Sequence, residues 1–207
     1  VSERVLTERE LNRALLARQL LLERVRLPIP RALERIGGIQ NQYAPNAYIR
    51  LWSCLEGFER GALDAALERR SVVQATLMRG TIHLVSRADY HRFGAAVGQP
   101  PWLRPEAAEI ADSLHDAIRA FGSEPRTRAE VTAFLAEAHA IEQPLAEAVW
   151  YGLRVRGRLT HAPDSGLWRT SGLTRYVALE HEAVDAEAAR VGLVRRYLGA
   201  FGPATRA

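Results

Sequence analysis

The feature that most limits the fold of this chain is a change of hydrophobic period near residue 71. Before this point apolar residues recur at helical spacing, whereas 71–78 and 81–85 are rich in β-branched residues and are joined by Arg79-Gly80. Two such runs around a short glycine-containing turn predict a β-hairpin. Helices followed by a hairpin are typical of a winged-helix module, so we expect a mainly α fold with small β-hairpins, in the α+β class.

The helices expected before and after this hairpin complete a first module at residues 1–101. Thr7 and Glu10 form a capping-box signature at the start of the first helix. Prolines and glycines separate the later helices. The helices that we expect here cover about 7–25, 30–36, 45–55, 62–70 and 89–97.

The same order of elements returns in a second module at residues 102–181. Helical spacing covers Pro105–Phe121, and Thr127 with Glu130 gives another capping box. Pro144–Arg154 follows in the position of a recognition helix. We expect the wing to pair 159–162 with 167–170 across an Asp-Ser-Gly turn.

The last part of the chain repeats the opening of the second module. Asp185–Phe201 has the spacing of an amphipathic helix, and the Phe-Gly-Pro sequence at its end echoes Phe121–Pro125. We therefore expect 182–207 to be the first helix of an incomplete third winged helix, in a truncated chain. Without its usual partners, this helix should pack back on the second module or fray.

The charge of the chain favours an anionic partner. The net charge is +4, and all 28 basic residues are arginine. Between Val149 and Leu179 a single acid, Asp164, stands against Arg154, Arg156, Arg158, Arg169 and Arg175. This concentration predicts that the recognition helix and the wing of the second module bind double-stranded DNA. The expected phosphate contacts are made by Arg154, Arg156 and Arg169.

Other side chains near the two hairpins are weaker candidates. Arg79 and Thr81 flank Gly80 in the first hairpin turn, where they can contact DNA. Trp168 stands among the wing arginines, so it is either a stacking platform for a base or a core residue. His83 lies in an apolar strand and is more commonly a hydrogen-bonded core histidine than a catalyst.

Two glutamines, Gln40 and Gln42, stand one residue apart between a Gly37-Gly38 pair and Pro45. We expect both amides at a junction between two helices. An amide has one acceptor and two N–H donors, so the pair can orient a water or read a base edge. Spacing alone favours a structural role, in which the amides form hydrogen bonds with exposed backbone groups of a turn.

Several of these segments together resemble a known family, the three-winged-helix proteins typified by the AlkZ and YcaQ DNA glycosylases. The resemblance rests on Gln40-Asn41-Gln42 with Pro45 and Leu51-Trp52, on Thr76–Val85, and on Tyr197–Pro203. It implies that Gln40 and Gln42 match the catalytic Gln-x-Gln motif of the family. It also implies that the chain excises alkylated purines or crosslinked bases from DNA.

The composition restricts the reaction mechanism and the cellular location that we expect. A glycosylase that also cuts the strand usually attacks the sugar with an amine, and this chain has no lysine. We therefore expect a monofunctional glycosylase that uses a water held by the two amides and no cofactor. One cysteine and scattered histidines predict no metal site. Without an apolar run of membrane length, we expect a cytoplasmic protein, nucleoid-associated when bound to DNA, with no membrane contact and no obligate protein partner.

Two functions of other classes remain open. A non-enzymatic winged-helix DNA-binding protein, such as a transcriptional regulator, would read its site through Pro144–Arg154. Replacement of Gln40 would leave its DNA binding intact, whereas an enzyme would lose turnover. A protein–protein adaptor built on winged helices would show no salt-dependent affinity for DNA.

Overall fold

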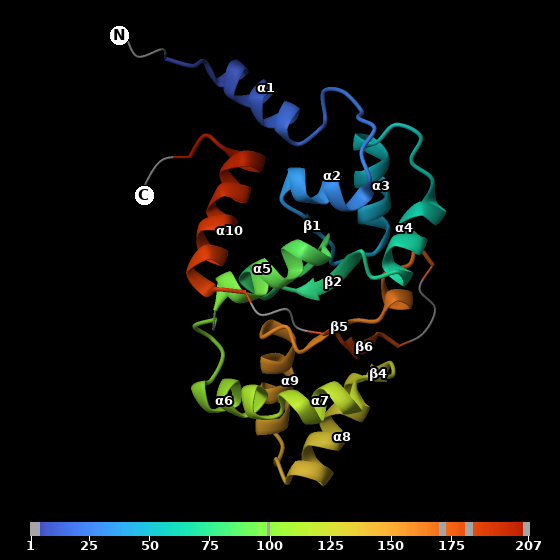
Figure 1. Cartoon of the computed structure of the whole chain (residues 1–207), viewed down its shortest axis with the longest axis vertical. Helices are drawn as coiled ribbons and strands as arrows, with labels where there is room; N and C mark the ends of the chain where they lie inside the picture. Colours follow the sequence, from blue (N-terminus) through green and yellow to red (C-terminus); the bar gives the residue numbers. More distant parts are fainter. Residues whose placement is uncertain (1–4, 99, 170–172, 181–183, 205–207) are drawn as a thin grey trace.

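The computed structural model describes residues 5–98, 100–169, 173–180 and 184–204. Figure 1 shows two groups of helices, one above the other, each with a small sheet; the strands of the lower group lie on its upper side, toward the other group. The described sheets have three antiparallel strands each, in the orders β1-β3-β2 and β4-β6-β5. Because both follow the same order of helices and strands, the structure confirms a mainly α, α+β fold of tandem winged helices.

The first unit contains the expected hairpin, with a short third strand at its edge. Gln40 in this strand pairs with His83. Val73 pairs with Val85 across the hairpin. Helices cover both faces of the sheet, α2–α4 one face and α5 the other. The elements of this unit are α2 (Ile29–Ile36), β1 (Ile39–Gln40), α3 (Pro45–Cys54), α4 (Arg60–Glu68), β2 (Val72–Thr76), η1 (Met78–Gly80), β3 (Ile82–Ser86) and α5 (Arg87–Val97).

The second unit repeats this arrangement around the fully buried side chain of Trp150. Its helix α9 lies one residue later at each end than the expected Pro144–Arg154. Its elements are α6 (Pro105–Ser113), α7 (His115–Phe121), β4 (Arg126–Thr127), α8 (Arg128–His139), α9 (Leu145–Val155), β5 (Leu159–His161), η2 (Pro163–Gly166) and β6 (Arg175–Ala178). The two-residue strands β1 and β4 are too short to show a strand period in the sequence.

Two of the helices in the structure are shorter than the sequence predicts. The first, α1 (Glu8–Arg18), does not reach Val25, because Leu20 has a φ of 56° that a right-handed helix cannot continue. Arg50 also donates to the carbonyl oxygen of Gln19 at 2.7 Å, just past the helix end. The other helix divides at Leu114, with φ −87° and ψ 11°, into α6 and α7.

The expected pairing within the second wing is wrong. β5 pairs with β6, where Leu159 lies opposite Ala178, and not with residues 167–169; Thr170 lies outside the described residues. The reason is visible at Trp168, which packs against the core of the first unit. Leu167 and Trp168, just after η2, therefore lie against the first unit, and β6 of the second sheet begins at Arg175.

The last helix, α10 (Ala186–Phe201), confirms the helix expected near the end of the chain. Its expected packing on the second module is wrong, since α10 lies against α5, α2 and α1 (Figure 1). Gln19 donates to the carbonyl oxygen of Ala200 at 2.9 Å. A Cβ on Gly37 would lie 3.2 Å from Ala200 Cβ, so a residue without a side chain allows this close approach.

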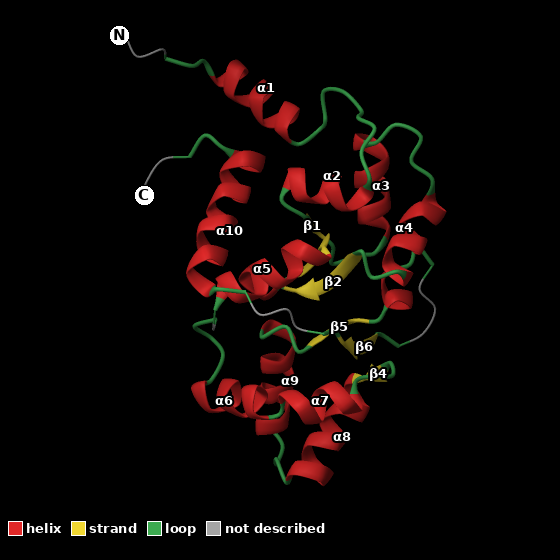
Figure 2. Ribbon diagram, in the orientation of Figure 1, coloured by secondary structure: helices red, strands yellow, loops and turns green. Residues whose placement is uncertain are grey.

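The two units meet through the outer strands of their sheets, β2 and β5, which lie near one another in Figure 2. Arg154 donates to the Thr76 hydroxyl at 2.6 Å, and the Tyr90 hydroxyl donates to the Gly157 carbonyl at 2.6 Å. These partly or fully buried polar contacts fix the orientation of one unit on the other. Among the described helices, none combines the length and apolarity that a bilayer span requires.

Candidate active site

Strand β1 directs Gln40 to the side of the first sheet that faces α5. Ile39 is buried in the opposite core, and alternation along a strand turns the next side chain to the other face. Gln40 is exposed, and its Oε1 accepts a hydrogen bond from Arg79 Nη2 at 3.2 Å. It borders a hollow of about 380 Å³ lined by Gly37, Gly38, Gln40, Met78, Arg79, His83, Phe93, Leu193, Arg196, Tyr197 and Phe201.

The tight turn η1 holds Arg79 beside Gln40. Arg79 and Gly80 have positive φ values of 57° and 69°, and Leu77 N–H donates to Thr81 O at 3.0 Å. Any Cβ on Gly80 would lie 2.7 Å from the Trp102 ring, so this position requires glycine. The turn therefore presents an exposed guanidinium to the amide oxygen of Gln40.

His83 lies opposite Gln40 in the sheet and lines the same hollow. Its Nδ1 is 3.0 Å from the carbonyl oxygen of Thr81. Since a carbonyl only accepts, Nδ1 carries a proton, and Nε2 is an acceptor in the neutral ring. Burial, assisted by the Arg79 charge and opposed by the Thr81 carbonyl, lowers the pKa of His83 below its usual 6.5. The imidazole is therefore neutral at neutral pH.

Asn41, between the two glutamines, is a buried structural residue. Its Nδ2 donates to Gln74 Oε1 at 3.0 Å, and its Oδ1 accepts from the Ala47 N–H at 3.2 Å, at the start of α3. These bonds turn the chain away from the sheet after β1. Gln42 then lies beyond the strand end, where its Oε1 accepts from the Ile82 N–H at 2.6 Å.

The two glutamines consequently line different hollows. Gln42 borders a second hollow of about 410 Å³, whose other lining residues include Tyr43, Gln74, His161, Trp168 and Arg169. Both side chains are exposed, and each amide oxygen already has one donor. Because an amide oxygen accepts two hydrogen bonds, each keeps one position for a water or a DNA group.

The predicted DNA contacts of the second unit have different surroundings. Arg154 is bonded to Thr76 and lies over the rings of Trp150 and Tyr176. Arg156 donates to Asp112 at 3.1 Å. Arg169 is exposed and has no acidic partner among the described residues. At the first hairpin, the Thr81 hydroxyl donates to Met78 O at 3.1 Å.

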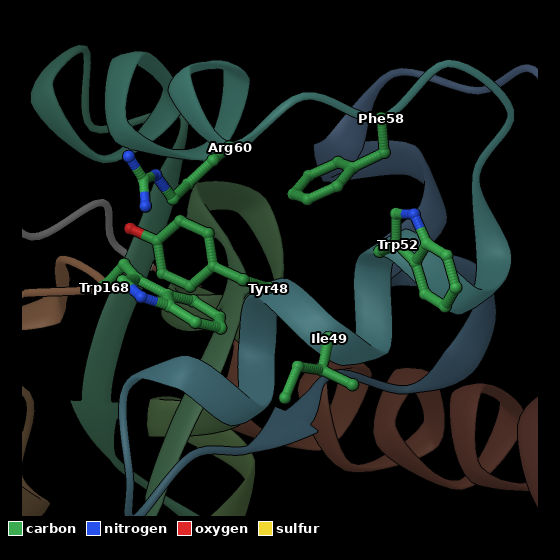
Figure 3. Close-up of a pocket in the computed structure, with 6 residues that line it drawn as sticks. All are labelled: Tyr48, Ile49, Trp52, Phe58, Arg60 and Trp168. Carbon is green, nitrogen blue, oxygen red and sulfur yellow. The ribbon is translucent and has the colours of Figure 1, made fainter.

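Trp168 packs on the first unit. Its ring meets Tyr48 edge-on, with ring centres 5.6 Å apart. Figure 3 shows this pair beside Arg60, across from Phe58 and Trp52, around an apolar hollow of about 520 Å³. Trp168 is partly buried in this packing, so here it contributes to a hydrophobic core.

Sequence reasoning missed the wall that α10 adds to the Gln40 hollow. Phe93 from α5 and Tyr197 and Phe201 from α10 place aromatic rings around the amide. A possible signal was Gly37, whose missing Cβ leaves room for Phe201 at 3.2 Å. Within the described part of the chain, no three His, Cys, Asp or Glu side chains gather as a metal-ligand set.

Comparisons with known proteins identify the family and the fold of this chain. The family model of the DNA glycosylase AlkZ-like proteins matches residues 33–207. The solved structure of Streptomyces sahachiroi DNA glycosylase AlkZ has a similar fold, with a TM-score of 0.71 at 20% sequence identity. The alignment covers 98% of this chain and 59% of that one, so the chain spans little more than half of the solved protein. A search of curated protein sequences gives no match.

Proposed function

This chain belongs to the AlkZ-like DNA glycosylase family, and from that premise we propose that it hydrolyses the N-glycosidic bond of an alkylated purine or crosslinked base in double-stranded DNA. The observation that carries the proposal is the position of Gln40. Its amide oxygen is anchored by Arg79 at the edge of a hollow that Phe93 and Tyr197 help to enclose.

The proposed chemistry suits a site without a strong acid. Alkylation at N7 or N3 makes a purine cationic, so the base takes the electron pair of the broken C1′–N bond and leaves as a neutral molecule. Positive charge gathers on the sugar as an oxocarbenium ion, as in glycoside hydrolysis. Water adds to C1′ and loses a proton, which leaves an abasic site in an intact strand.

The two amides stabilise this charge through their oxygens. A preorganised amide oxygen interacts with a developing cation and also accepts a hydrogen bond from the attacking water. The bond from Arg79 holds the Gln40 amide in place, and the Ile82 N–H does the same for Gln42. Since the amides border separate hollows, we propose that they approach the reacting sugar from different sides, with the attacking water on Gln40.

His83 is the proposed acceptor of the water proton. Its Nδ1–H points to Thr81 O, which leaves Nε2 as the basic atom of a neutral ring beside Gln40. Arg79 and Thr81 are proposed to contact the DNA backbone at the turn, because a guanidinium has further N–H donors beyond the one used by Gln40.

Single-turnover release of 7-methylguanine from duplex DNA tests the proposal. We expect Gln40→Ala or Gln42→Ala to slow excision about a hundredfold or more with DNA affinity nearly unchanged, as for an interaction made mainly in the transition state. Asn46→Ala, which removes an exposed amide from the start of α3, is the matched control and should leave the rate unchanged. DNA binding without release by the unmodified protein would instead favour a winged-helix regulator.

A further inference from the structure

A hollow of about 420 Å³ opens where α10 lies against α2 and α5, and neither glutamine lines it. Four of its lining residues are arginines, and the α10 side includes two glycines. The lining residues are Glu34, Arg35, Arg92, Gly192, Arg195, Arg196 and Gly199. We call this the arginine hollow.

Two of its arginines form hydrogen bonds with a buried carboxylate. Asp89 is 1% exposed, and its Oδ1 accepts from Arg92 Nη1 at 2.7 Å and from Arg196 Nη2 at 2.9 Å. Among the described residues, the buried Nε of Arg196 has no hydrogen-bond partner. The guanidiniums are therefore oriented by the protein while part of their donor capacity stays unused.

The other two arginines leave the hollow with excess positive charge. Arg35 and Arg195 are exposed, and neither has an acidic partner in the described part of the chain. The one acid in the lining, Glu34, is engaged by Arg31 at 2.7 Å. Guanidiniums gathered around one space repel each other unless an anion lies between them.

The glycines of α10 keep the space open. A Cβ on Gly192 would lie 2.8 Å from Arg92 Cδ, so any side chain there would displace this arginine. A Cβ on Gly199 would have no atom within 4 Å, which shows that this face of the helix borders free space. The hollow thus combines oriented donors, excess charge and room for a group of several atoms.

We propose that the arginine hollow binds a phosphodiester group of the DNA on which the enzyme acts. Planar guanidiniums match phosphate oxygens in charge and in fork geometry. Arg196 also lines the hollow that Gln40 borders, so the two sites share a wall. A phosphate held there fixes the strand relative to Gln40. This inference rests on the proposed function, because DNA supplies the phosphate.

The test changes the charge of the hollow without removing an arginine. Gly199→Glu and Gly199→Gln place side chains of nearly equal size at the same open position. We expect Gly199→Glu to weaken binding of a duplex at low salt about tenfold or more relative to Gly199→Gln, and to reduce the salt slope of the binding constant by about one unit. Arg195→Gln should act in the same direction, whereas Arg190→Gln, an exposed arginine of the same helix outside the lining, should have a smaller effect.

A second arm uses inorganic phosphate and separates the two proposals. Thermal unfolding of each variant is measured in phosphate and in chloride of equal ionic strength, and phosphate should stabilise Gly199→Gln more than Gly199→Glu. If the variants bind DNA and excise the base equally, the inference is wrong while the glycosylase function stands. Phosphate stabilisation in a protein that binds no DNA would reject the proposed function and DNA as the source of the phosphate. Equal stabilisation of both variants, without DNA binding, would reject the site itself.

Discussion

The two winged-helix units have the same element order but differ directly after their first strands. In the second unit β4 ends at Thr127 and α8 begins at the next residue, with Thr127 as its N-cap. In the first unit, residues 41–44 separate β1 from α3. These extra residues move the start of the helix away from the strand, so that Gln40 and Gln42 are exposed instead of capping a helix. The candidate active site therefore lies at the longer of the two junctions.

The wings of the two units also differ, in their turns and in what they pack against. The first turn, η1, is closed tightly by Arg79 and Gly80 and leaves the guanidinium exposed beside Gln40. The second wing runs over the first unit, where η2 lies against α4 and Trp168 packs on Tyr48. We propose that the first unit carries the chemistry and that the second wing mainly holds the two units together.

The largest expected effect tests this role of the second wing. Trp168→Ala should lower the free energy of unfolding by about 2–3 kcal/mol, because it removes an aromatic ring packed against a core. Trp52→Ala, in the same hollow but 56% exposed, is the matched control and should cost less than about 1 kcal/mol. Urea denaturation measures both. Equal losses would show that Trp168 is no more structural than its exposed neighbour.

The next effect compares two buried histidines. His161 in β5 has no hydrogen-bond partner at either ring nitrogen among the described residues, and burial, then the Arg154 charge, lowers its pKa to about 3. The folded state therefore resists its protonation, whereas the unfolded state takes up a proton below pH 6.5. Stability contributed by neutral His161 is complete above pH 6.5 and is lost as pH falls toward 3, by about 1.4 kcal/mol for each pH unit.

Denaturation of the protein and of His161→Phe at several pH values measures this loss. The variant should lose less stability between pH 6.5 and 5, since it has no imidazole to protonate when the chain unfolds. His83 differs in having a carbonyl partner for Nδ1, and its titration remains in the variant. An acid dependence identical in both proteins would show that His161 contributes nothing to it.

Much of the fold of the two units could be predicted from the sequence. Period and capping signals gave the helices and the first hairpin, because those segments are long and strongly patterned. The strands β1 and β4 were not predicted, because each has only two residues. The path of the second wing depended on the packing of Trp168 against a residue more than a hundred positions away, which no local pattern records. Our module boundaries, near 101 and 181, remain a proposal, and residues 181–183 lie outside the described part.

The candidate site was predictable to a similar degree. Gln40 and Gln42 were found from a motif that the family resemblance supplied, and Arg79 from its place in the hairpin turn. The aromatic wall from α10 was missed because it arises only when the end of the chain packs on the first unit. The division of the two amides between separate hollows depends on the bonds of Asn41, whose burial is not apparent from its polarity.

A smaller effect tests the junction of the second unit. The Thr127 hydroxyl accepts from the Glu130 N–H at 3.3 Å at the start of α8. Thr127→Ala should lower the free energy of unfolding by about 1 kcal/mol, the usual effect of a lost N-cap. It should leave the excision rate unchanged, because the equivalent junction of the first unit is the one assigned to chemistry. Chemical denaturation and a single-turnover assay on the same preparation measure both quantities.

The smallest effects concern the arginines predicted to contact phosphates. Each such arginine that is neutralised should reduce the salt slope of DNA binding by about one unit. We expect the clearest change from Arg169→Gln, since Arg154 and Arg156 already bond to Thr76 and Asp112. Titrations of a duplex at several salt concentrations measure the slopes. If all three variants keep the slope of the unmodified protein, the DNA lies on another face.

The central claim is that the amides of Gln40, at the end of β1, and of Gln42, just after it, perform the reaction, while the matching junction of the second unit is structural. The most direct measurement is single-turnover release of 7-methylguanine by Gln40→Ala/Gln42→Ala and by Thr127→Ala, followed by borohydride treatment. The account predicts a loss of about a hundredfold or more in the first variant, an unchanged rate in the second, and no trapped adduct. Undiminished release by the double variant, or a covalent protein–DNA adduct, would contradict it.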